Sequence, residues 1–130
     1  MTEDQRAAMV ATCIRALPEE GCGLLLGTSE GVVLEVVPSE NVAHSARVYE
    51  IDSRVLLRAF RRADDGGTQV IGVFHSHTHS DPYPSPTDVA QAPDPAWHYV
   101  LVGLRDAAAV LASYRIVEGV ITPEEVTTSH

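Results

Sequence analysis

The chain contains no lysine: all nine of its basic residues are arginine, against 18 aspartate and glutamate residues. Without lysine there can be no Walker A phosphate loop, no Schiff-base chemistry and no lysine general base. The formal net charge of −9 at pH 7 disfavours duplex nucleic acid, because binding to DNA or RNA needs a basic surface. We therefore expect no nucleic-acid partner.

Cysteines and long apolar runs are also scarce. Cys13 and Cys22 are the only cysteines, too few for a disulfide scaffold or a four-cysteine zinc site. No window approaches the ~18 apolar residues of a membrane span. The acidic first residues show no apolar stretch with a cleavage site, so no secretory signal is expected. These absences favour a cytoplasmic protein with reduced thiols and no membrane partner.

The pattern of apolar residues indicates an α/β fold. The length of 130 residues suits one domain, 1–130. Periodicity predicts helices over 3–17, 54–63 and 85–92 and strands over 22–26, 32–37, 69–74, 98–104 and 109–117, with loop and strand over 43–51. Since helices alternate with hairpin-linked strands, we expect a mixed β-sheet with flanking helices. Residues 119–130 are expected as a loose tail, unless VITPEEV adds a final turn or edge strand.

Three of the six histidines, His75, His77 and His79, lie within five residues at the end of an apolar run. On a strand, residues i and i+2 face the same side and are about 7 Å apart. His75 and His77 can therefore converge on one metal ion. The alternative is a polar strand end with solvated histidines, and this reading is favoured for His79.

The segment Ser85-Pro86-Thr87-Asp88 predicts a helix start, with Ser85 as N-cap and Pro86 at the first helical position. Capping does not exclude a second role, because Asp88 in the first turn can face back toward the histidines. Two histidines and one carboxylate leave a fourth tetrahedral position for water, which is the pattern of a catalytic zinc site.

These residues together resemble a known family. His75-Ser76-His77, seven residues, Ser85, two residues and Asp88 match the signature of the JAMM (MPN+) metalloproteases. The Glu-X-X-Gly motif of that family is matched by Glu20-Gly21-Cys22-Gly23. The resemblance covers nearly the whole chain and implies a JAMM/MPN (cytidine-deaminase-like) architecture.

The resemblance also implies roles for single residues. His75, His77 and Asp88 would hold one Zn²⁺ with a bound water, and Glu20 would carry the proton from that water to the leaving amine. Ser85 would donate a hydrogen bond to the oxyanion. Ser76, on the other face of the strand, is expected to be structural, whereas the roles of His79 and Asp81 stay open.

Residues 83–89 and 98–102 further resemble small bacterial peptidases that act on ubiquitin-like sulfur-carrier proteins. This implies a carrier with a Gly-Gly tail as partner, and hydrolysis after its C-terminal glycine with release of cysteine. The tail is expected to bind as an added strand, bordered by Asn41 and residues 47–50. A peptidase that trims C-terminal extensions and a non-catalytic MPN-type scaffold are the alternatives, although the intact five-residue set argues against the scaffold. A homodimer is left open.

Overall fold

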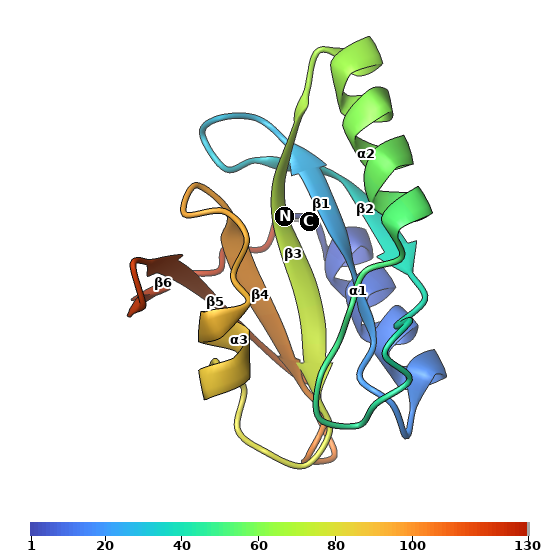
Figure 1. The fold of residues 1–130 in the computed structure, drawn as a ribbon, viewed down its shortest axis with the longest axis vertical. Helices are drawn as coiled ribbons and strands as arrows, with labels where there is room; N and C mark the ends of the chain where they lie inside the picture. The colour runs from blue at the N-terminus through green and yellow to red at the C-terminus, as the bar shows by residue number, and fades with distance from the viewer. Residues whose placement is uncertain (130) are drawn as a thin grey trace.

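The computed structural model describes residues 1–129 and contains one six-stranded mixed sheet (Figure 1). Its elements in chain order are α1 (Glu3–Ala16), β1 (Cys22–Gly27), β2 (Val33–Ser39), α2 (Ser53–Gly66), β3 (Gln69–His77), α3 (Pro86–Ala90), β4 (His98–Gly103), β5 (Val110–Val117) and β6 (Val120–Glu124). The strand order is β2-β1-β3-β4-β5-β6. Only β3 and β4 pair in parallel, joined by the crossover that contains α3. The expected mixed sheet with flanking helices is confirmed.

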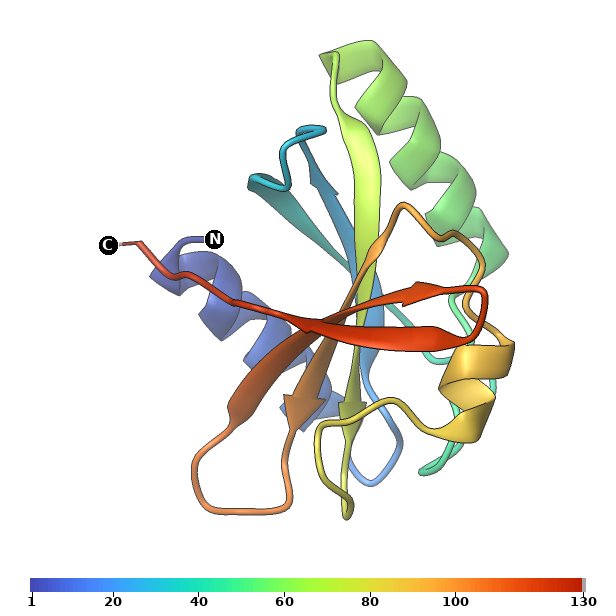
Figure 2. The same cartoon turned by 90° about the vertical axis from the view of Figure 1, so that its left-hand side faces the viewer.

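Helices cover both faces of this sheet (Figure 2). Leu24 and Val73 belong to the core cluster under α2, whereas Leu25 and Phe74 belong to the cluster under α1. Because neighbouring strand residues face opposite sides, burial on both faces explains why β1 and most of β3 read as continuous apolar runs. The α2 face also receives α3, through Val89, and this is the face that matters for the site.

Two expectations need correction. Residues 43–51 form no strand but a loop closed by a single bridge, Asn41–Ile51, because the Asn41 side chain takes up main-chain groups that a strand would have paired. The strand expected over 69–74 continues to His77, since β1 and β4 pair with it on both sides.

For residues 120–124, the edge strand that VITPEEV offered as the alternative to a loose tail is confirmed. Residues 120–124 form β6, the edge strand, which pairs with β5. Beyond it, the amino terminus of Met1 donates to the Thr127 carbonyl at 3.0 Å, and Ser129 bridges to Thr2. The two ends of the described chain are therefore joined. No helix within residues 1–129 has the length and apolar character that a membrane crossing requires.

Candidate metal centre

The central strand β3 positions both histidines of the predicted site. It is paired with β1 on one side and β4 on the other, and His75 faces Cys22 and Leu101 in these ladders. His75 and His77 are 2% and 5% exposed, and both project on the α2 face because they are two residues apart. Two-sided pairing holds their backbone rigidly.

Asp88 reaches these histidines from α3. Ser85 and Asp88 form the predicted capping box: the Asp88 N–H donates to Ser85 Oγ at 3.1 Å, and the Ser85 N–H donates to Asp88 Oδ2 at 2.9 Å. The same Oδ2 lies 3.2 Å from His75 Nε2 and 3.0 Å from His77 Nε2. Asp88 is thus both a helix cap and a candidate ligand. The donor atoms of His75, His77 and Asp88, hereafter the ligand group, lie within 4.8 Å of one another.

The hydrogen bonds around His77 indicate what this group is built to hold. His77 Nδ1 lies 2.8 Å from the Asp81 carbonyl, which can only accept, so Nδ1 carries the proton. The lone pair of a neutral His77 Nε2 then faces the carboxylate oxygen of Asp88, and only a proton or a cation between them removes the repulsion. His75 Nε2 is buried and lies 3.2 Å from Asp88 Oδ2, but the angles of this contact are not those of a hydrogen bond, and no other partner is present within residues 1–129. Two imidazole nitrogens and a carboxylate in this arrangement fit a zinc ion.

The pKa shifts follow from the same contacts. Burial lowers the pKa of His75 and favours its neutral, metal-binding form. Burial alone would raise the pKa of Asp88, but the imidazoles of His75 and His77 outweigh it and hold that pKa well below its usual range. Asp88 is therefore an anion at neutral pH, as a metal ligand must be.

Glu20 lies beside the ligand group at the entry to β1. Its main chain is held on both sides: the N–H donates to the Ser45 carbonyl at 2.8 Å, and the carbonyl accepts from Asn41 Nδ2 at 3.0 Å. Glu20 is buried, and its Oε1 has no hydrogen-bond partner among residues 1–129. Burial raises the pKa of Glu20 to about 8, although the charge of a protonated His77 acts to lower it. This carboxyl group can thus take up and release a proton near neutral pH.

Ser76 points away from the ligand group. Its Oγ accepts from the Gly21 N–H at 2.8 Å, and its own N–H donates to the Gly21 carbonyl at 3.0 Å. Ser76 therefore fixes the residue next to Glu20 against β3, consistent with the structural role expected for it.

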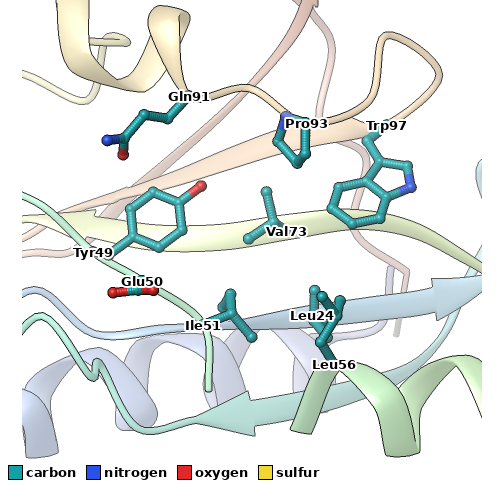
Figure 3. Close-up of a pocket in the computed structure, with 9 residues that line it drawn as sticks. All are labelled: Leu24, Tyr49, Glu50, Ile51, Leu56, Val73, Gln91, Pro93 and Trp97. Carbon is teal, nitrogen blue, oxygen red and sulfur yellow. The ribbon is translucent and has the colours of Figure 1, made fainter. Parts of the chain in front are cut away.

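Two cavities flank the ligand group. A polar cavity of about 470 Å³ is lined by Glu20, Arg47, His77, His79 and Ser85, together with Ala46, Thr78 and Ser80. An apolar cavity of about 220 Å³ lies under α2 and the segment after α3. In Figure 3, Tyr49 and Trp97 lie on either side of Val73 in the apolar cavity. The Tyr49 ring also stacks on His75, with centroids 4.1 Å apart, a contact that the sequence reasoning missed.

The other candidate residues, His79, Asp81 and Asn41, are not part of the ligand group. His79 is exposed and lines the polar cavity, with Nδ1 2.8 Å from Thr78 Oγ1, but it is not in the ligand group. Asp81 orients His77 through its carbonyl, while its carboxylate pairs with Arg105 at 2.6 Å. Asn41 does not line either cavity but is buried beneath the loop that does.

Comparison with known proteins agrees with this geometry. The family described as prokaryotic homologs of the JAB domain matches residues 2–117. The chain is 41% identical over 121 residues to the CysO-cysteine peptidase of Mycobacterium tuberculosis, covering 92% of this chain and 83% of that protein. It is 32% identical over 114 residues to a probable TtuB-protein conjugate cleaving protease of Thermus thermophilus, covering 85% and 71%.

A solution structure from Desulfitobacterium hafniense superposes with a TM-score of 0.90 at 32% identity, covering 98% of this chain and 90% of that one. The sheet, the ligand group and the adjoining glutamate define a protein with a JAB-type, or JAMM/MPN, domain. This chain belongs to the prokaryotic branch of that family.

Proposed function

We propose that the chain is a zinc-dependent peptidase of ubiquitin-like sulfur-carrier proteins. It would hydrolyse the amide bond after the C-terminal glycine of the carrier and release cysteine. The observation that carries the proposal is the buried His75–His77–Asp88 group with Glu20 beside it. The Mycobacterium relative is a CysO-cysteine peptidase and the Thermus relative a probable TtuB-protein conjugate cleaving protease, and both support a peptidase of this substrate class.

His75, His77 and Asp88 would hold the zinc ion, and the Asp81 carbonyl would keep His77 in the tautomer that offers Nε2. When bound, zinc lowers the pKa of a coordinated water to about 7 and polarises a substrate carbonyl. The buried position of the group keeps bulk water away and strengthens these electrostatic effects.

Glu20 would accept a proton from the attacking water and deliver it to the leaving amine. A carboxyl group with a pKa of about 8 matches this task, because a proton carrier works best when its pKa is near the operating pH. Hydrolysis then leaves the hydroxyl group on the glycine carboxyl and the proton on the released amine.

Ser85 has a hydroxyl proton available for the oxyanion. Its Oγ already accepts from the Asp88 N–H, and this bond fixes the oxygen without using its own proton. Ser85 lines the polar cavity with Glu20. Loss of one such donor typically lowers kcat by about 10²–10³-fold.

The substrate tail would bind along the loop of residues 46–50. β3 is already paired on both sides, so the tail cannot add to it. Within residues 1–129, the main-chain N–H and C=O of Tyr49 form no hydrogen bond, and they are available to an extended peptide. Glycines in the tail would let its main chain approach this loop closely, because they have no side chains.

The test compares two substrates with protein purified without chelator. We expect a carrier–cysteine conjugate to release cysteine and leave a carrier ending in Gly-Gly, as followed by intact mass. Glu20→Gln is expected to keep the metal, measured by elemental analysis, and to lose about 10²-fold or more in turnover. His77→Ala and Asp88→Ala are expected to lose both metal and turnover.

Two results would favour the other functions. Trimming of a C-terminal extension without cysteine release would indicate a processing peptidase. Absence of bound zinc, with no gain of activity when zinc is added, would indicate a non-catalytic scaffold.

A further inference from the structure

The ligand group lies between two cavities that are lined by different kinds of side chain. Val73, His75 and His77 project from one face of β3 at steps of about 7 Å. Val73 lines the apolar cavity and His77 lines the polar cavity, with His75 between them against Tyr49. The direction of β3 can therefore be used to assign each side of a scissile bond to one of the two cavities.

The polar cavity is on the leaving-group side of this axis. Both Glu20 and Ser85 line the polar cavity, and neither lines the apolar one. Because the leaving amine must receive its proton from Glu20, the amine has to lie in the polar cavity. The carrier tail then extends the other way, past Tyr49 toward the apolar cavity of Figure 3.

Arg47 gives the polar cavity a feature that the hydrolysis itself does not require. It is the only arginine that lines the cavity, and its side chain is exposed. Within residues 1–129 Arg47 forms no ion pair, whereas Arg54, Arg62 and Arg105 each pair with a carboxylate. In a chain with twice as many acidic as basic residues, a guanidinium without a partner beside the reacting groups is available to an anion.

We propose that Arg47 binds the α-carboxylate of the leaving amino acid, which makes the polar cavity a subsite for a free C-terminal residue. The planar guanidinium matches a carboxylate with two parallel hydrogen bonds. The direction of binding rests on the proposed function.

This assignment separates two classes of substrate. A C-terminal amino acid has its carboxylate one carbon away from the leaving nitrogen, within the same cavity. The ε-amine of a lysine in a protein conjugate has no carboxylate there, so Arg47 would contribute nothing to its release. The chain is thus a peptidase that removes a terminal amino acid in preference to one that splits isopeptide conjugates.

The test changes both partners of the contact. Two synthetic peptides ending in Gly-Gly-Cys, one with a free C-terminal carboxylate and one with a carboxamide, are hydrolysed by the zinc-loaded wild type and by Arg47→Gln. We expect kcat/KM of the wild type to favour the free acid by about tenfold, the low end for a charged hydrogen bond because the site is exposed. Arg47→Gln is expected to treat both peptides alike.

Arg58→Gln is the matched control, since Arg58 is an exposed α2 arginine without an ion pair within residues 1–129. It should keep the wild-type preference. The proposal is overturned if the wild type shows no preference for the free acid, or if Arg47→Gln retains that preference.

Failure of the proposed function has a separate signature. If neither peptide is hydrolysed, calorimetric binding of the same two peptides decides the subsite. Tighter binding of the free acid that disappears in Arg47→Gln supports the subsite although the peptidase proposal has failed. Equal binding of both peptides by the wild type overturns the subsite as well.

Discussion

Asn41 is expected to hold the loop of residues 43–50 in place, and its replacement tests this directly. The side chain is 4% exposed and makes five hydrogen bonds to main-chain groups on both sides of the loop. Its Nδ2 shares its two hydrogens among the carbonyls of Glu20, Ser45 and Val48. Its Oδ1 accepts from the N–H groups of Ala43 and Glu50. One side chain therefore ties residues 43–50 to the main chain of Glu20.

The magnitude for Asn41→Ala follows from the burial of these bonds. The bond to Glu20 is buried, and its loss leaves a carbonyl without a partner at a cost of about 2 kcal/mol. The other four are partly buried, and water can replace them at about 0.5 kcal/mol each. We expect the free energy of unfolding to fall by about 4 kcal/mol.

Urea denaturation followed by circular dichroism measures this change, with the slope of the transition checked for constancy. Ser45→Ala is the control, because Ser45 Oγ accepts from two N–H groups of the same loop, in contacts that are exposed or partly buried. It should cost about 1 kcal/mol or less. If Asn41→Ala loses no more than Ser45→Ala, the loop is held by something other than the Asn41 side chain.

Three further predictions concern packing, thiols and metal. A Cβ at Gly23 would lie 2.4 Å from the Phe74 ring. Gly23→Ala should therefore lower the thermal midpoint by an amount equivalent to about 1–3 kcal/mol. Gly66→Ala is the control and should leave the midpoint unchanged, because its Cβ would have no neighbour nearer than 4.0 Å. Burial raises the pKa of Cys13 and Cys22 to about 12 from 9.0. Above pH 9 the unfolded chain releases these protons while the folded chain keeps them, so the free energy of unfolding should fall as pH rises, and a double alanine variant should show a smaller slope. Removal of zinc by a chelator should lower the melting temperature of the wild type, with recovery on adding zinc, and an unchanged midpoint would argue against a structural contribution from the metal.

The ligand group could be predicted because its spacing is local. A His-X-His pair at a strand end shares one face whatever surrounds it, and the Ser85–Asp88 capping box turns the carboxylate by rules of helix geometry alone. The buried strands could be predicted for a similar reason, since apolar runs such as Cys22–Gly27 lie under helices on both faces. These features depend on short-range pattern.

The features that sequence reasoning missed depend on contacts between distant residues. The final segment is held by a hydrogen bond across 126 positions, from Met1 to Thr127, which no local periodicity encodes. The loop of residues 43–50 forms no strand because the Asn41 side chain bonds to its main chain, and the same side chain reaches the Glu20 carbonyl across 21 positions. Glu20, whose pKa is raised by burial, is followed by Gly21, and Gly21 is hydrogen-bonded to Ser76 across 55 positions.

This division between local and distant contacts bears on how the site can change its substrate. The ligand group belongs to β3 and α3, which the sheet ladders and the capping box hold. Arg47 and Tyr49 belong to the loop that Asn41 holds, and each faces a different cavity. Under the proposed function, a substitution at position 47 would alter the leaving group that is accepted without moving the ligand group, whereas a change at Asp88 would remove a proposed ligand and the helix cap together. Specificity for the released group would then vary independently of zinc affinity in this chain.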